Sequence, residues 1–199
     1  MIYWGRFEKD ADDTDDIKEQ LADLTNGVTL IRNQAKVSIV KTETVDNQTT
    51  TVDSWENDYF TVSGFRTANI HAFGTVAPYC PTHGFEITQW PNDHLSVTLP
   101  VNKAMMSDIV DVNTAMADYI FEHENTLDNP VSVIIKGRNK SETITDELYY
   151  RVLLQDANGE PLKILRNHHY QINIVGTLSY GQASFEDALN APATNNVWV

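Results

Sequence analysis

The chain is poor in cysteine, in basic residues and in long apolar runs. Among its 199 residues there is one cysteine, Cys80, so an intrachain disulfide is excluded. There are 14 lysine and arginine residues against 28 aspartate and glutamate residues, which gives a formal net charge of -14. Such an acidic chain is not expected to bind nucleic acid, because phosphate binding needs a basic surface. No segment approaches the roughly 18 to 20 consecutive apolar residues of a membrane-spanning helix.

The sequence also lacks the motifs of common enzyme classes. There is no Gly-x-Ser-x-Gly turn for a nucleophilic serine and no glycine-rich loop for phosphate. Glu122, Glu124 and Asp128 are of the type that glycosidases use, but that chemistry needs a separation of roughly 5 to 9 Å that sequence does not give. We therefore interpret these three residues as solvated surface groups and expect a non-enzymatic protein without a cofactor.

Histidine and aspartate residues give two weak signs of metal binding. Cys80 and His83 form a single Cys-x-x-His, which is half of a zinc motif. His168 and His169 are adjacent, and neighbouring residues on a strand point to opposite faces, so they do not easily share a metal. The acidic segment 8–24 is interpreted as a short helix with a charged start, and a calcium site is the alternative. Its aspartates are Asp10, Asp12, Asp13, Asp15 and Asp16. The favoured prediction is that the chain holds no metal.

Two runs near the C-terminus alternate between apolar and polar positions. They are residues 149–155 and residues 164–176, and a period of two is typical of a strand with one buried face. The apolar positions are Tyr150, Val152 and Leu154 in the first run and Tyr170, Ile172 and Ile174 in the second. Between the runs, Asn158 and Gly159 are expected to supply the positive φ angles of a tight reversal. The two runs therefore predict an antiparallel β-hairpin.

Much of the remaining sequence consists of short β-prone segments between turn residues. The β-prone segments are residues 28–40, 59–62, 95–101, 119–122 and 131–136. Residues 46–54 indicate a turn region, and residues 104–116 indicate a loop with some helix. Many short strands with hardly any long helical pattern favour an antiparallel β-sandwich. Glycine and proline residues between positions 70 and 90 indicate a domain boundary.

Four ordered segments resemble the fimbrillins, the pilus subunits of Bacteroidales. Residues 30–37 (LIRNQAKV) are similar to a family signature near the end of the N-terminal domain. Residues 119–125 (YIFEHEN) are similar to a family strand that is followed by a segment such as residues 133–137. The last two matches are residues 149–152 (YYRV) and 166–170 (RNHHY), with Gly181 and residues 186–189 beyond them. On this resemblance the chain is identified as a member of the fimbrillin family.

The resemblance implies an all-β, mainly antiparallel protein with two transthyretin-like sandwich domains. Residues 1–75 would be the C-terminal part of an N-terminal domain, and residues 76–199 would be the C-terminal domain. It also implies a lipoprotein precursor with a signal peptide, exported to the outer membrane. Since neither a leader nor a lipid-bearing cysteine is recognised near the start, we expect an incomplete subunit, with a leaderless protein as the alternative. Side-chain hydrogen bonds from Arg166, Asn167 and His168 are expected where their strand begins.

The resemblance further implies assembly by donor-strand exchange. In this scheme a protease trims the precursor, and a neighbour's C-terminal strand then completes the sandwich. The apolar residues Val197, Trp198 and Val199 are the predicted start of the donor strand. The expected function is a structural subunit of a cell-surface pilus (fimbria) that supports cell adhesion, with other pilus subunits of the same or related type as partners. The alternative is a tip adhesin or glycan-binding module in which Trp55 and Trp90 contact a surface glycan or protein.

Overall fold

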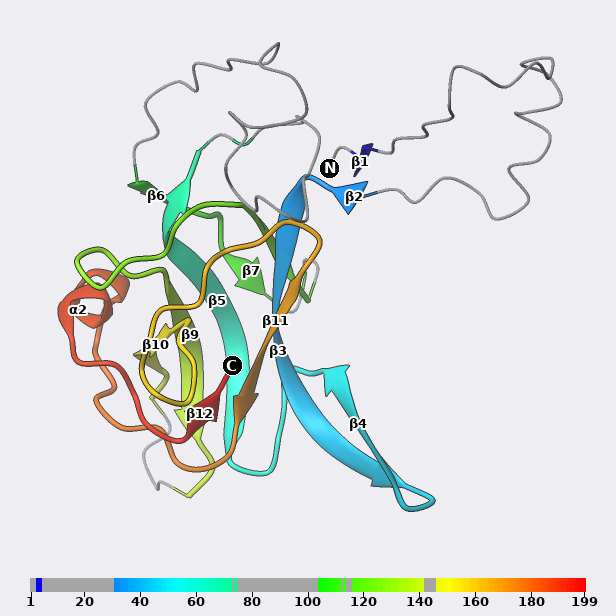
Figure 1. Cartoon of the computed structure of the whole chain (residues 1–199). Helices are drawn as coiled ribbons and strands as arrows, with labels where there is room; N and C mark the ends of the chain where they lie inside the picture. The colour runs from blue at the N-terminus through cyan, green and yellow to red at the C-terminus, as the bar shows by residue number, and fades with distance from the viewer. Residues whose placement is uncertain are drawn as a thin grey trace, which may run out of the picture.

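The computed structural model describes residues 3–4, 31–72, 74, 104–111, 113, 116–141 and 146–199, which form β-strands and one short helix (Figure 1). The strands are β1 (Tyr3–Trp4), β2 (Ile31–Arg32), β3 (Gln34–Val45), β4 (Gln48–Asp53), β5 (Phe60–His71), β6 (Ala104–Met106), β7 (Val110–Asp111), β8 (Asp118–Phe121), β9 (Ser132–Asn139), β10 (Leu148–Leu153), β11 (His169–Ile174) and β12 (Val197–Trp198), and the helix is α2 (Phe185–Asn190). The predicted all-β, mainly antiparallel fold class is confirmed for this part of the chain.

Two sheets make up the body of the molecule. The first has the strand order β10, β9, β5, β6, and β7 also pairs with β5. The second has the order β12, β11, β3, β4, and β8 pairs with the first part of β3. Among the described strands every pairing is antiparallel except that of β11 with β3, which is parallel. Helix α2 covers the outer face of β9 and β10 (Figure 1).

One hydrophobic core lies between the two sheets. Its largest fully buried side chains include Phe60, Phe65, Ile135 and Tyr150 from the first sheet and Ile120, Ile172 and Ile174 from the second. Burial of each such side chain contributes on the order of 1.5 to 3 kcal/mol. Strands from both sides of position 75 share this core, because β5 pairs with β9 and β3 pairs with β11. The predicted boundary between residues 75 and 76 therefore does not divide the described residues into two sandwiches.

The predicted hairpin of β10 with β11 is wrong in its pairing. Both strands exist and bury the expected positions, such as Val152 and Ile172. However, β10 pairs with β9 in the first sheet, whereas β11 pairs with β3 in the second. The alternation in the sequence correctly shows that each strand buries one face. However, these two faces meet across the core, because the strands belong to opposite sheets and are not neighbours in one sheet.

A local reversal does follow β10. Leu162 N donates to Leu154 O at 2.9 Å, and Gly159 has a φ of 85°, while Asn158 does not take the positive φ that was expected of it. Beyond Pro161 the chain crosses to the second sheet, where Ile164 pairs with His123 as an isolated bridge. The chain therefore reverses after β10, but the strand that follows does not pair with β10.

The other predicted segments agree with the structure or differ from it in detail. The predicted strands at 119–122 and 131–136 are confirmed as β8 and β9. Residues 46–54, predicted as a turn region, contain a two-residue turn followed by β4, whose β-branched threonines suit a strand. Residues 104–116, predicted as a loop with some helix, contain the short strands β6 and β7.

Several predictions fall on residues that the structure does not describe. They are the helix at 8–24 with its five aspartates, the strand at 95–101, and the residues Cys80, His83 and Trp90.

Candidate functional site

The C-terminal segment that the sequence singles out is an edge strand of the second sheet (Figure 1). β12 pairs antiparallel with β11, with Val197 opposite Ile174 and Trp198 opposite Asn173. The side chain of Trp198 is 60% exposed, whereas Val197 and Val199 are partly buried against the core. The predicted donor residues therefore lie on a sheet of their own chain.

β12 covers only the last part of the β11 edge. The ladder begins where Val175 N donates to Asn196 O at 2.9 Å, and it reaches no further than Asn173. Residues 169–172 of β11 pair with β3 on one side and, within the part of the chain that the structure describes, with no strand on the other. A cavity of about 420 Å³ lies beside β12, between the end of β10 and the turn at residues 156–159. The β11 edge is therefore partly unpaired, and the cavity lies beside the terminal segment that pairs with it.

Four polar side chains meet on the outer face of the second sheet. Lys36 Nζ lies 2.6 Å from an oxygen of Asp53, and Ser38 Oγ donates to the other oxygen of Asp53 at 2.7 Å. The same Ser38 Oγ lies 2.7 Å from His169 Nε2. Sequence reasoning missed this cluster because Ser38 and His169 are 131 positions apart and meet only through the parallel pairing of β3 with β11.

The cluster is not arranged as a catalytic triad. A triad needs the histidine to accept the serine proton and the carboxylate to hold the other ring nitrogen. Here Ser38 donates its proton to Asp53, so its lone pairs face His169 Nε2, which is then the donor. Burial, followed by the charge of Lys36, lowers the pKa of His169. For Asp53, burial works to raise the pKa, but hydrogen bonds from Lys36 and Ser38 outweigh it and lower the pKa. The cluster ties β3, β4 and β11 together.

Two histidines stack between the sheets, His71 at the end of β5 and His123 two residues after β8. The rings of His71 and His123 lie 4.2 Å apart at an angle of 21°. His123 is buried, its Nδ1 lies 2.9 Å from Phe121 O, and its Nε2 has no hydrogen-bond partner among the described residues. Burial lowers the pKa of both histidines. No group of three or more possible metal ligands occurs among the residues that the structure describes.

A buried ion pair holds the chain where it enters β11. The guanidinium of Arg166 donates to both carboxylate oxygens of Glu122, with Nε 2.6 Å from Oε2. His168 Nδ1 lies 2.9 Å from Arg166 O, and Asn167, with a φ of 61°, donates its main-chain N to Gln34 O at 3.0 Å. The side-chain hydrogen bonds expected from Arg166 and His168 are present, whereas the contact of Asn167 with Gln34 is made by its main chain.

The three carboxylates of the glycosidase alternative do not form a shared site. Glu122 is bound to Arg166, and Glu124 Oε1 lies 3.2 Å from Lys163 Nζ. Asp128 is exposed. Two of the three groups are thus occupied by cations of the same chain.

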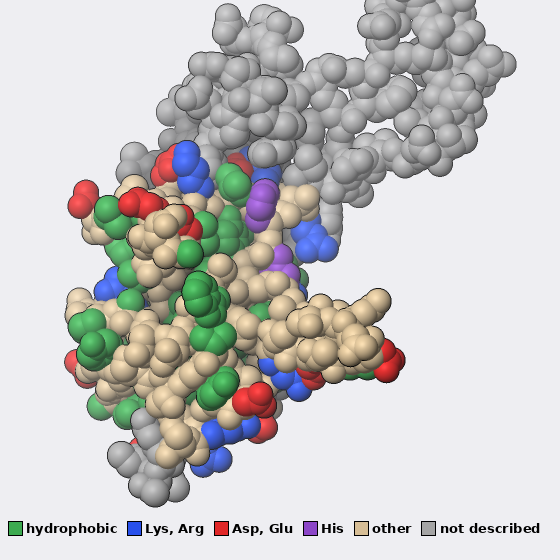
Figure 2. Space-filling view, turned by 60° about the horizontal axis from the view of Figure 1, so that its bottom comes forward, with side chains coloured by type: hydrophobic (Ala, Val, Ile, Leu, Met, Phe, Trp, Pro, Cys, Tyr) green, Lys and Arg blue, Asp and Glu red, His purple; other side chains and the backbone are tan. Residues whose placement is uncertain are grey.

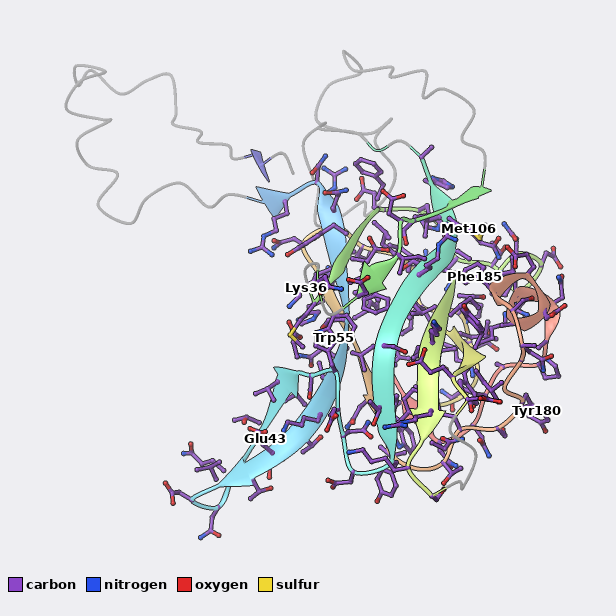
Figure 3. All side chains as sticks on the ribbon, turned by 180° about the vertical axis from the view of Figure 1, so that it is seen from behind. Lys36, Glu43, Trp55, Met106, Tyr180 and Phe185 are labelled. Carbon is purple, nitrogen blue, oxygen red and sulfur yellow. The ribbon has the colours of Figure 1, made fainter. Side chains whose placement is uncertain are left out.

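Trp55, one of the two predicted glycan contacts, packs against the core. Its ring lies 6.2 Å from that of Phe65 at an angle of 42°, and its side chain is partly buried. Figure 3 shows Trp55 between β3 and β5. The ring therefore takes part in the packing of the core.

Comparison with protein-family models, with curated proteins and with solved structures finds no match to this chain. Within the described residues, no helix is long and apolar enough to cross a membrane.

Proposed function

We propose that this chain is a structural subunit of a cell-surface filament of the fimbrillin type, which assembles when a strand of one molecule completes a sheet of the next. The observation that carries the proposal is the short ladder of β12, which leaves residues 169–172 of β11 without a second partner strand among the described residues. Unpaired main-chain groups at a sheet edge readily accept another strand. The β11 edge is therefore the acceptor in the proposed contact, in which a neighbour's terminal segment takes the place of β12 opposite Asn173 and Ile174 and points toward residues 169–172.

The donor in this proposal is the segment of Val197, Trp198 and Val199. Its ladder with β11 contains few hydrogen bonds, each worth about 0.5 to 1.5 kcal/mol net, but its release also exposes the partly buried Val197 and Val199. Binding to the next molecule restores the same contacts and so offsets this cost. When the same segment pairs with β11 of the next molecule, every subunit gives one segment and receives one. Such a head-to-tail contact does not close on itself and produces a filament.

The remaining features of the proposal follow the family resemblance. They are a transthyretin-like sandwich, an exported lipoprotein precursor at the outer membrane, related pilus subunits as partners and a role without enzymatic activity. The alternative of a glycan-binding module gains no support from Trp55, because its ring packs against Phe65.

Deletion of residues 196–199 tests the proposal. The trimmed subunit is expected to stay folded, by circular dichroism and thermal unfolding, but to form no filaments in electron micrographs. Tyr180→Ala is a matched control, because Tyr180 is 58% exposed and Trp198 is 60% exposed, yet Tyr180 lies outside the ladder. The control should assemble like the unmodified chain. Normal assembly of the trimmed subunit would show that the donor is wrong.

A further inference from the structure

The hairpin of β3 and β4 projects from the body as an arm. β3 is buried up to Val40, and from Lys41 to the turn its residues are largely exposed, as are those of β4 as far as Val52. In Figure 2 the arm projects to the right and is mostly tan, and Figure 3 shows Glu43 well away from the core. The arm therefore offers both of its faces and the outer edge of β4 to solvent.

The turn type determines which main-chain groups point outward. Asp46 and Asn47 have φ angles of 51° and 64°, which is typical of a two-residue type I′ turn. In such a hairpin the flanking pair, Val45 and Gln48, is hydrogen-bonded, and bonded pairs then alternate along the ladder. The N–H and C=O groups of Gln48, Thr50 and Val52 therefore face β3, whereas those of Thr49 and Thr51 face away from it.

The outer edge of β4 has none of the usual protection against pairing. Among the described strands, β3 alone pairs with β4. β4 contains no proline, lysine or bulge, which are the common means of blocking an edge. Residues 47–52 (NQTTTV) are uncharged in a chain whose net charge is -14. This segment therefore adds no like-charge repulsion of its own between two copies.

We propose that the outer edge of β4 pairs antiparallel with the same edge of a second copy of this chain, centred on Thr50. In this register Thr50 lies opposite Thr50 of the second copy, and Thr49 lies opposite its Thr51. Thr49 and Thr51 then exchange the hydrogen bonds that their outward groups can make. Cross-strand threonine pairs are favourable. The only acidic residue of β4, Asp53, meets Asn47 of the second copy, so no two carboxylates face each other.

The contact is weak on its own. It involves about five residues from each copy, far fewer than the roughly 20 to 30 residues a side of a stable interface. Many such β4 contacts add up only where many subunits are arranged in a row. Between two filaments, they would hold the filaments side by side. That last step rests on the proposed function, whereas the pairing of two copies in solution does not.

Cysteine substitutions test the register. In a Cys80→Ser background, Thr50→Cys places two sulfurs on a non-hydrogen-bonded pair, where Cα atoms are about 4.5 Å apart and a disulfide fits. Thr49→Cys on the same exposed strand is the matched control, because its two copies would lie roughly 9 Å apart. In a glutathione redox buffer, Thr50→Cys should form at least tenfold more disulfide-linked dimer than Thr49→Cys. Equal amounts, or preferential linkage of Thr51→Cys, would overturn the proposal.

A proline substitution tests the edge itself. Thr51→Pro removes an outward N–H and leaves the ladder with β3 intact, and Thr51→Val keeps that N–H as a control. In sedimentation at rising concentration, the average mass of the unmodified chain and of Thr51→Val should increase, while Thr51→Pro should remain a monomer with an unchanged unfolding temperature. The proposal fails if the folded proline variant associates as strongly as the control, or if the unmodified chain shows no increase in mass.

Discussion

At the scale of single residues, asparagine side chains replace main-chain partners inside the sandwich. Asn125 is buried, its Nδ2 donates to Leu154 O at 2.9 Å and to Leu162 O at 3.1 Å, and its Oδ1 accepts from Val131 N at 2.8 Å. Asn139 makes a similar pair of contacts with the main chain of Leu178. These amides fix loops where no strand is available as a partner.

Asn125→Ala should lower the free energy of unfolding by about 2 to 4 kcal/mol, because it removes the side-chain partner of the buried Val131 N and the bonds to Leu162 O and Leu154 O. Leu154 O still accepts from Leu162 N, so the main loss is at Val131 N and Leu162 O. Urea unfolding measures this change. Asn158→Ala, in the exposed turn, should change the free energy by less than about 0.5 kcal/mol. Similar losses in the two variants would contradict the role given to Asn125.

The ion pair of Arg166 and Glu122 should be much more costly to break than to replace. Arg166→Met is expected to cost about 3 to 5 kcal/mol, because it leaves a buried carboxylate unpaired. The double variant with Glu122→Leu should recover most of this loss. Thermal unfolding of the single and double variants tests the prediction, and purely additive losses would rule it out.

The stacked histidines should make stability depend on pH. Burial lowers the pKa of His123 from the ordinary 6.5, so the unfolded chain binds protons at a higher pH than the folded chain does. The contribution of His123 to stability is therefore fully present above pH 6.5. It is lost as the pH drops from there toward the pKa of His123 in the folded chain. His123→Gln should flatten this decline when unfolding is followed from pH 7 to pH 5. An equally steep decline in the variant would contradict the expectation.

At the scale of elements, alternation in the sequence locates strands but not their neighbours. Tyr150 and Tyr170 both mark buried faces correctly, yet their strands lie in different sheets. The parallel pairing of β11 with β3 joins segments distant in sequence, and no local pattern signals it. Of the candidate site, the apolar terminal segment could be predicted, because Val197 and Val199 are apolar and β-prone. Its pairing with Ile174 depends on the whole fold.

Two glycines show how the cost of a substitution depends on the surroundings of the residue. A Cβ on Gly137 in β9 would lie 2.2 Å from Thr61 O and 2.4 Å from the Phe60 ring, so Gly137→Ala should cost about 3 kcal/mol or more. Gly159 has open space around it but a φ of 85°, so Gly159→Ala should cost only about 1 kcal/mol. Urea unfolding of both variants measures which substitution costs more. A larger loss for Gly159→Ala would contradict the close contact of Gly137 with Thr61 and Phe60.

At the scale of the whole molecule, the described strands include two partly open sheet edges that differ in their properties. The β11 edge lies next to the apolar terminal segment, and the outer edge of β4 lies on a polar arm. A net charge of -14 opposes unspecific association of such molecules. In the assembly that we propose, main-chain pairing at defined edges supplies the specific contacts, with the β11 edge lengthening a filament and the β4 edge joining filaments.

The central claim, that the terminal segment pairs with β11 of another molecule, can be tested with two single-cysteine subunits in a Cys80→Ser background. One carries Asn173→Cys and the other carries Trp198→Cys, two positions that lie opposite each other in the ladder. A disulfide between them can form only between molecules. Mixed under assembly conditions and oxidised, they should yield a cross-linked heterodimer on a denaturing gel, in proportion to the filaments formed. Filaments without any such cross-link would contradict the account.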